Sequence, residues 1–246
     1  MKIQYLSDLH LEFHPDGGKA FIDTLDPQGV DVLILAGDVI SQAQGKQAVE
    51  SLGYICRRYK NARVLYVTGN HEYYGGTVHG LRDKLQAAVA KNKNLRWMDS
   101  RVVEIQGQRF VGTSLWYQWN YYTMGNDPAW SDFTHIRFLK AWINDTGTQE
   151  RRFLMKEVRS GDIVITHFLP SESAVAPRWR GAPTKGFFVS PMDDLIMDRQ
   201  PRLWIHGHTH DTIKATLGAT SILANPFGYF RREVNPNFDP RALIEI

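Results

Sequence analysis

The sequence has few of the features that mark secreted, membrane-spanning or nucleic-acid-binding proteins. Its 246 residues contain one cysteine, Cys56, so neither an intrachain disulfide nor a zinc cluster of thiolates can form. No apolar run approaches the roughly 20 residues that a membrane-spanning helix needs, and the N-terminal residues are typical of a strand, not of a signal peptide. The formal net charge is only +3, which gives little support for a nucleic-acid partner. We therefore expect a cytoplasmic protein with no membrane partner.

The chain also lacks low-complexity tracts, internal repeats and linkers rich in Gly, Pro or Ser. Because nothing in the composition divides the chain, we expect residues 1–246 to form a single domain. One segment differs from the rest, since residues 116–133 are dense in aromatic side chains and show no clear periodicity. We expect a long excursion near the entrance of a site. Packing of these rings in a satellite core is at least as well supported.

What the chain does contain is a series of short apolar runs rich in β-branched residues, which are typical of buried strands. Segments with helical periodicity separate the first three runs, so the pattern predicts βαβ units and a largely parallel sheet. Later runs, with a hairpin around Gly107, predict a second and more antiparallel set of strands. We expect an α/β protein in which two sheets pack face to face with helices on both outer faces. The main runs are residues 2–6, 31–36, 62–68, 162–166 and 202–205, and the helical segments are residues 44–60 and 77–92.

Residue types that bind metals follow all five of these runs. Ligand sites in open α/β sheets form beyond the carboxyl ends of the strands, so five strands would bring these side chains to one rim. Each residue alone has an ordinary explanation, such as a turn, a helix cap or a hydrogen-bonded core histidine. Turn chemistry does not explain five strands that end in the same way. The residues are Asp8, His10, Asp38, Asn70, His71, His167, His206, His208 and His210.

The set combines carboxylate, amide and imidazole groups without a thiolate. Such groups suit divalent first-row metals, namely Mn, Fe, Co, Ni or Zn, and leave the choice among them open. There are too many ligands for one ion, and two ions roughly 3.5–4 Å apart need a group that touches both. Asp38 follows the middle of the three leading strands and is the candidate for this bridging carboxylate. Gly37 and Gly69 allow the backbone to turn tightly toward the ions.

In kind and order, these motifs resemble those of the calcineurin-like metallophosphoesterase superfamily. The matching stretches are Asp8-Leu9-His10, Gly37-Asp38, Gly69-Asn70-His71-Glu72, His167 and Gly207-His208-Thr209-His210. The resemblance spans residues 8–210 and implies a four-layer α/β/β/α sandwich of two mixed β-sheets flanked by helices. It also implies two ligand sets, which are Asp8, His10, Asp38 and His210 for one ion, and Asp38, Asn70, His167 and His208 for the other.

Two histidines stand outside these sets. Spacing alone allows either His206 with His208 or His208 with His210 as a ligand pair. The family pattern Gly-His-x-His selects the second pair, which leaves His206 to pack or to hydrogen-bond to neighbouring groups. His71 matches the family position beside the leaving-group oxygen, where a proton donor or a stabiliser of developing charge is needed. The near-neutral pKa of an imidazole suits that role. Glu72 has no catalytic role in this interpretation.

The resemblance implies hydrolysis of a phosphoester by a metal-bridging hydroxide, with His71 assisting the leaving group. The segment from Ser7 to Glu12 resembles the phosphodiesterase-like branch more than the protein phosphatases, which have glycine at the position of Leu11. The favoured substrates are therefore small-molecule phosphodiesters or phosphomonoesters. In the aromatic stretch, the rings of Trp116, Tyr117, Trp119 and Tyr122 would stack on a nucleobase, and packing in the core is the alternative.

Two other functions share these motifs. One is a DNA nuclease of the Mre11/SbcD type, which usually carries further DNA-binding segments. Such an enzyme binds duplex DNA through many phosphate contacts, and the small net charge of this chain weighs against it. The other is a non-catalytic, protein-binding scaffold like the one in the retromer complex. A scaffold would be expected to lose ligands or His71, and this chain keeps all of them.

Overall fold

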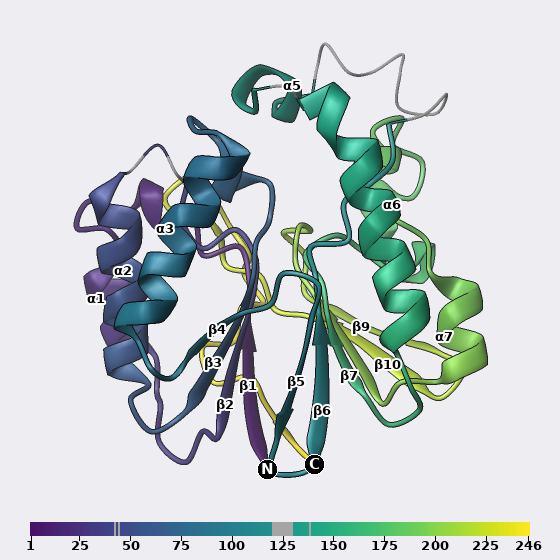
Figure 1. The fold of residues 1–246 in the computed structure, drawn as a ribbon, viewed down its shortest axis with the longest axis horizontal. Coiled ribbons are helices and arrows are strands. Elements are labelled where there is room, and N and C mark those ends of the chain that lie inside the picture. The colour runs from purple at the N-terminus through teal and green to yellow at the C-terminus, as the bar shows by residue number, and fades with distance from the viewer. Residues whose placement is uncertain (42, 44, 120–129, 138) are drawn as a thin grey trace.

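The computed structural model describes residues 1–41, 43, 45–119, 130–137 and 139–246. Two mixed β-sheets pack face to face, and helices lie on the outer side of each sheet (Figure 1). The four-layer α/β/β/α sandwich predicted from the sequence is therefore confirmed.

The first sheet contains five strands in the order β13-β1-β2-β3-β4. Its three central strands are the first three apolar runs of the sequence, and they are parallel, as the βαβ pattern predicts. β4 extends the parallel part and β13 pairs antiparallel with β1. The strands are β1 (Lys2–Leu6), β2 (Val32–Ala36), β3 (Arg63–Val67), β4 (Leu95–Trp97) and β13 (Leu243–Glu245).

Three helices cover the outer face of this sheet (Figure 1), and two of them are the segments predicted from periodicity. Gln44, at the start of the first predicted helical segment, lies outside the described residues. The helices are α1 (Lys19–Thr24), α2 (Lys46–Arg58) and α3 (Val78–Lys91).

The second sheet contains six strands in the order β5-β6-β7-β8-β10-β9. Its four central strands are parallel and only its two edge pairs are antiparallel. The predicted antiparallel character is therefore confined to the edges. Helices α6 (Leu139–Glu157) and α7 (Asp193–Arg199) join β6 to β7 and β7 to β8, and β9 joins β8 to the parallel strand β10. The strands are β5 (Arg101–Ile105), β6 (Gln108–Gly112), β7 (Ile163–Ile165), β8 (Leu203–His206), β9 (Ile213–Leu217) and β10 (Thr220–Ala224).

The hairpin predicted around Gly107 joins β5 to β6. Its two loop residues, Gln106 and Gly107, have φ values of 50° and 81°. Positive φ at both positions is the requirement of the two-residue turns that fit the twist of a hairpin, and glycine meets it without strain.

Helices α6 and α7 cover the second sheet (Figure 1). The sequence analysis did not predict α6, because its middle contains Thr146, Gly147 and Thr148, all of which are weak helix formers. Packing explains the glycine, since a Cβ added at Gly147 would lie 2.8 Å from the carbonyl oxygen of Trp116. In the described part of the chain, no helix is both long enough and apolar enough to cross a membrane.

Buried aliphatic side chains from both sheets meet between them. Ile3, Ile34 and Leu65 from the first sheet share one core with Ile163 and Ile205 from the second. Burial of each such side chain contributes about 1.5–3 kcal/mol. This shared core fixes the two sheets to each other, and with them the loops that follow their parallel strands.

Candidate metal centre

The loops after β1, β2, β3, β7 and β8 bring the candidate ligands together at one rim of the sandwich. Three overlapping sets of ligand atoms, each lying within 4.8 Å of one another, are formed by Asp8, His10 and His210, by Asp38, His167 and His208, and by His10, Asp38 and His71. Asn70 joins the second set, because its Oδ1 lies 3.1 Å from His167 Nε2 and 3.1 Å from His208 Nδ1. We refer to Asp8, His10 and His210 as the Asp8 group, and to Asn70, His167 and His208 as the Asn70 group.

Asp38 lies between the two groups. Its Oδ2 is 3.8 Å from His10 Nε2 and its Oδ1 is 3.5 Å from His167 Nε2. Each oxygen of the carboxylate thus faces a different group, which is the position that a bridging ligand requires. The arrangement matches the two ligand sets implied by the family resemblance, although metal binding by these residues is still a prediction.

The backbone at the site is strained. Asp8, His10, Asp38 and His208 have φ between 44° and 64°, a region that residues other than glycine seldom adopt. Each such residue costs about 1–3 kcal/mol, and strain of this kind concentrates at functional sites. The surrounding sheets hold these residues in place.

Glycines form the floor beneath the ligands. A Cβ added at Gly37 would collide with His167, and one at Gly69 would collide with both Asp38 and His167. Gly207 is equally confined, by Asp8 and by the backbone of β2. Gly37 also has a φ of 87°, whereas Gly69 is needed for space alone. The tight turn predicted at both positions therefore has a backbone requirement at Gly37 and a spatial one at Gly69, and its direction toward metal ions stays a prediction.

Each candidate imidazole ligand has an acceptor near its second ring nitrogen. A proton held between that nitrogen and the acceptor leaves the lone pair of the other nitrogen facing the group. The contacts are His10 Nδ1 to Glu12 Oε1 at 3.3 Å, His210 Nδ1 to Glu233 Oε2 at 3.5 Å, His167 Nδ1 to the Ala36 carbonyl at 2.9 Å and His208 Nε2 to the Phe187 carbonyl at 3.2 Å.

Buried polar atoms at the site need a cation. Asp8 Oδ2 is buried and has no hydrogen-bond partner among the described residues, and burial raises the pKa of Asp8 to about 6. Two pairs of imidazole nitrogens face each other, His10 Nε2 with His210 Nε2 at 3.3 Å and His167 Nε2 with His208 Nδ1 at 3.2 Å. Their lone pairs repel unless a proton or a cation lies between them. The oxygen and nitrogen donors therefore fit divalent metal ions.

His71 lies beside the Asp8 group, at the start of a short 3-10 helix, η3 (His71–Tyr73). Its backbone N–H donates to Asp38 Oδ1 at 2.9 Å, and its Nδ1 lies 3.1 Å from Glu12 Oε1. Burial alone would lower the pKa of His71, but the charges of Asp38 and Glu12 raise it to about 9. The contact with the Glu12 carboxylate favours the protonated form of the ring, which is the form that a proton donor needs.

Three carboxylates without an assigned role in the sequence analysis organise the site. The first is Glu12, whose Oε1 contacts Nδ1 of both His10 and His71, at 3.3 Å and 3.1 Å. One carboxylate oxygen thus orients a candidate ligand and the candidate proton donor together. The sequence places Glu12 two residues after His10, but that spacing does not reveal the contact with His71.

The second is Asp132, a buried residue at the start of α5 (Asp132–His135). Its Oδ1 accepts a hydrogen bond from Asn70 Nδ2 at 2.8 Å and another from the Tyr74 hydroxyl at 2.7 Å. Its Oδ2 accepts from Trp130 Nε1 at 2.9 Å. Because the amide nitrogen of Asn70 donates to Asp132, the amide oxygen faces His167 and His208.

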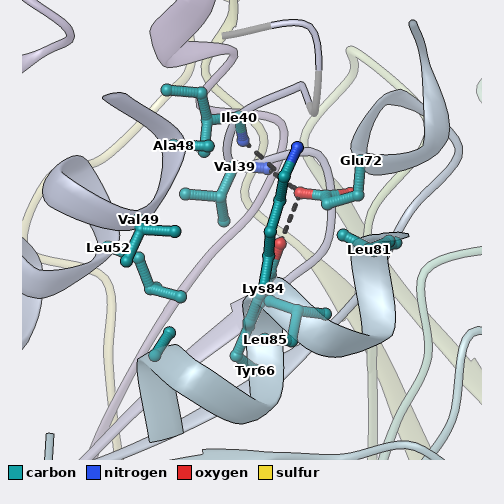
Figure 2. A pocket seen from close by; sticks show the side chains of 11 residues that line it. Val39, Ile40, Ala48, Val49, Leu52, Tyr66, Glu72, Leu81, Lys84 and Leu85 are labelled. Atoms are coloured by element: carbon teal, nitrogen blue, oxygen red, sulfur yellow. Dashed lines mark hydrogen bonds between the residues drawn. The ribbon is translucent and has the colours of Figure 1, made fainter. Parts of the chain in front are cut away.

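The third is Glu72, which ties the loop after β2 to the loop after β3. Its carboxylate accepts from the backbone N–H groups of Asp38, Val39 and Gly69 at 3.0, 2.6 and 2.7 Å, and from the Tyr66 hydroxyl at 2.7 Å. Figure 2 shows this carboxylate beside Val39 and Tyr66, at the edge of a small pocket lined mainly by apolar side chains of α2 and α3. The loops that carry Asp38 and Asn70 are fixed to each other in this way.

His206 belongs to neither group. It is buried at the end of β8, its Nδ1 lies 2.9 Å from the Gly207 carbonyl, and its Nε2 has no partner among the described residues. Burial lowers the pKa of His206 to about 4. His206 is also absent from the groups of side chains that could hold a metal among the described residues, which agrees with the interpretation that it is not a ligand.

The aromatic stretch differs from one of its two sequence interpretations. Trp116 and Tyr117 are completely buried in the core, and Trp119 packs against that core, so stacking of a substrate on Trp116 or Tyr117 is wrong. Tyr122 and the rest of residues 120–129 lie outside the described residues. Large aromatic side chains gain the most from burial, so they pack in the core where other side chains can contact them.

Other rings line the cavity of about 240 Å³ that opens over the two groups. Trp130 belongs to the aromatic stretch expected near the entrance of a site, whereas no signal in the sequence distinguished Trp179, Phe188 and Tyr229. The cavity is lined by Asp38, Asn70, His71, His208 and His210 and by Trp130, Ser131, Arg178, Trp179, Phe188, Thr209, Tyr229 and Glu233.

The pattern of the calcineurin-like phosphoesterase family matches residues 1–212, and the chain belongs to this family. With the His/Asp groups at its rim, it is a metal-dependent phosphoesterase. An uncharacterised protein of Acanthamoeba polyphaga mimivirus is 25% identical over 276 residues, which cover 99% of this chain and 96% of that protein. Phosphopantetheinyl hydrolase from Mycobacterium tuberculosis shares the fold, with a TM-score of 0.74 and 17% identity over 94% of this chain and 90% of that one.

Proposed function

We propose that the protein hydrolyses small-molecule phosphodiesters or phosphomonoesters at a centre of two divalent metal ions. One ion would be held by the Asp8 group and the other by the Asn70 group, with Asp38 shared between them. The observation that carries the proposal is the convergence of both groups on one cavity, with a carboxylate between them. Mn, Fe, Co, Ni and Zn all suit the donor set.

Bound ions of this kind supply an activated water and neutralise charge on the phosphate oxygens. His71 lines the same cavity and would give its Nε2 proton to the departing oxygen. Glu12 contacts the other ring nitrogen and so keeps the proton-bearing Nε2 directed away from it. The Tyr229 hydroxyl, 3.3 Å from Nε2, holds the ring in place until a substrate oxygen takes over.

The charge around the cavity favours a small substrate over duplex DNA. Arg178 is the one lysine or arginine among the described residues that line the cavity. It already pairs with Asp211 at 3.0 Å and with Glu233 at 3.7 Å. Duplex binding needs many free basic contacts to phosphates, so the nuclease interpretation has little support here.

The proposal extends to the setting of the enzyme. Cys56 is buried, and burial raises the pKa of its thiol to about 12, so the thiol is inert and compatible with a reducing cytoplasm. We place the reaction there, and we treat residues 1–246 as one domain because both sheets share a core. The fold match adds phosphopantetheine esters to the substrates worth testing.

The test starts from metal-free protein reloaded with Mn, Fe, Co, Ni or Zn. Metal content is measured together with turnover of phosphomonoesters, phosphodiesters, cyclic nucleotides, a phosphopantetheine ester and single-stranded DNA. We expect two ions per chain and turnover of the small esters. His71→Asn should keep the ions and lose roughly 10²–10⁴-fold in kcat, the usual contribution of a general acid. Absence of metal uptake, or a strong preference for DNA, would contradict the proposal.

A further inference from the structure

One exposed tryptophan stands at the mouth of the cavity. Trp179 is 43% exposed and lies at the end of a 3-10 helix, η6 (Pro177–Trp179). Exposure of large apolar surface beside a cavity often marks the place where a ligand binds. Of the large apolar side chains that are exposed in the described chain, Trp179 alone lines this cavity, and the others are Met155, Met197, Val234 and Leu243.

The ring of Trp179 is held in place although it is exposed. Its Nε1 donates to Asp211 Oδ2 at 3.1 Å, and Arg178 Nε donates to the same oxygen at 3.0 Å. The Arg178 guanidinium also lies 4.8 Å from the centre of the Trp179 ring. An exposed side chain normally loses rotamer freedom when a ligand covers it, and a ring fixed in advance avoids most of that loss.

The surroundings of the ring are apolar on one side and acidic on the other. Trp179 and Phe188 line both the main cavity and a small adjoining pocket that is mainly apolar. Lys185 also lines that pocket, and its charge is paired with Glu172 at 2.8 Å. On the charged side, Asp211 and Glu233 outnumber Arg178, which pairs with both. A second anionic group of a substrate would be repelled here, whereas an uncharged planar group would be accepted.

We propose that Trp179 and Phe188 form a subsite for an uncharged planar ring carried by the phosphoester substrate. The inference rests on the proposed function, because the phosphate must lie at the metal centre for the ring to reach Trp179. A substituted phenyl group and a nucleobase share the required chemistry. Arg178 and Asp211 act as positioning residues that keep the Trp179 ring in its orientation.

The experiment compares two non-hydrolysable phosphonates as competitive inhibitors of the metal-loaded enzyme, phenylphosphonate and methylphosphonate. Both offer the same head group to the metals, so the ratio of their inhibition constants isolates the ring. In the wild type, the phenyl compound should bind roughly tenfold more tightly, within the range of a single aromatic stack. Trp179→Ala should bring the ratio close to one, and Trp179→Phe should restore most of it. Met197→Ala, which removes an exposed apolar side chain elsewhere, should keep the wild-type ratio.

Two further comparisons of ligands test the charge preference and the kind of ring that the subsite accepts. A carboxylate added to the ring, as in 4-carboxyphenylphosphonate, should weaken binding several-fold because of Asp211 and Glu233. AMP compared with ribose 5-phosphate, titrated into His71→Asn protein, shows whether a nucleobase gains as much as a phenyl ring does. Equal inhibition by the two simple phosphonates in a wild type that hydrolyses phosphoesters would overturn the subsite alone. A wild type that binds no metal and hydrolyses no ester would instead overturn the proposed function.

Discussion

The two halves of the candidate metal centre contain similar side chains but hold them differently. In the Asp8 group, His10 and His210 contact the carboxylates of Glu12 and Glu233. In the Asn70 group, both imidazoles contact backbone carbonyls. The His210 side chain is 13% exposed and that of its partner Glu233 is 48% exposed, whereas the His167 side chain is completely buried.

Asp8 and His10 are as buried as His167, so the two groups differ in the acceptors that contact their imidazoles and in the partial exposure of His210. A carboxylate acceptor makes an imidazole a stronger donor to a metal than a carbonyl does, and solvent access allows ligands and ions to exchange. The backbone carbonyls and the amide of the Asn70 group carry no net charge. Because they are buried, they have less freedom to move than the partly exposed side chains of His210 and Glu233. We infer that an ion in the Asp8 group exchanges faster than an ion in the Asn70 group.

The largest effect is expected at Asp38, which the two halves share. Asp38→Ala removes the carboxylate whose two oxygens face the two groups, so the halves should behave as separate and weakened sites. We expect kcat/KM to fall by at least about 10²–10³-fold, the scale of losing one strong electrostatic contact in an active site. Metal content measured by mass spectrometry should fall below two ions per chain. A variant that keeps two ions and full turnover would show that the halves are independent.

The next effect separates the neighbouring histidines of the cluster. His208→Asn should reduce metal content from two ions to one, because it removes a nitrogen that faces Asn70 and His167. His206→Asn is the matched control, since the same substitution two residues away should leave both ions bound. If His206→Asn lost an ion and His208→Asn kept both, His206 and not His208 would be the ligand in the Asn70 group.

A smaller effect is expected from the residue that orients Asn70. Asp132→Asn disturbs the carboxylate that accepts from Asn70 Nδ2, so one ion should bind roughly 10–100-fold more weakly, the usual consequence of losing a ligand's hydrogen-bond partner. Calorimetric titration with Mn²⁺ measures this change.

Glu150→Gln is the control for Asp132→Asn. Glu150 is another buried carboxylate, but it accepts from Thr113 and Trp116 and contacts neither group. Its substitution should change thermal stability without changing metal affinity. Equal loss of affinity in the two variants would mean that general loosening of the fold, not the orientation of Asn70, is responsible.

The smallest effect is expected at Glu233, the exposed partner of His210. Glu233→Gln should speed the removal of one ion by a chelator about two- to fivefold, because partly exposed ion pairs contribute only about 0.2–1 kcal/mol. Stopped-flow release into EDTA should show two phases in the wild type, with only the faster one altered in the variant. A single phase in the wild type would remove the distinction between the halves.

Much of the fold was predictable from the sequence. Short apolar runs fixed the positions of the main strands, and Gly107 marked the hairpin, because buried strands and tight turns depend on local residue types. β4 and α6 were missed for the opposite reason. Arg96 lies within the three-residue β4 and Gly147 lies within α6, and both elements are stabilised by neighbours that are distant in the sequence.

The candidate site divides in the same way. Its candidate ligands could be selected because each follows a strand, so the sequence alone contains the pattern. The sequence did not reveal the carboxylates that orient the site, because each contacts a residue that is distant in the sequence. They are Glu12, Asp132 and Glu233. Trp116 and Tyr117 were misinterpreted because a dense aromatic stretch looks the same whether its rings face the core or a cavity. Nothing in the sequence indicated that Trp179 lines the cavity, since a single tryptophan in an irregular segment belongs to no periodic pattern or motif.

The glycine floor sets where this enzyme can change. Side chains at Gly37, Gly69 and Gly207 would displace the residues above them. Substitutions at these three glycines would therefore disrupt the site. Variation can reach it from the open side, where Arg178 and Trp179 line the cavity and are not among the candidate ligands. Directed evolution toward new esters should therefore succeed through substitutions at the opening of the cavity, because these leave the candidate ligands and the hydrolytic reaction unchanged.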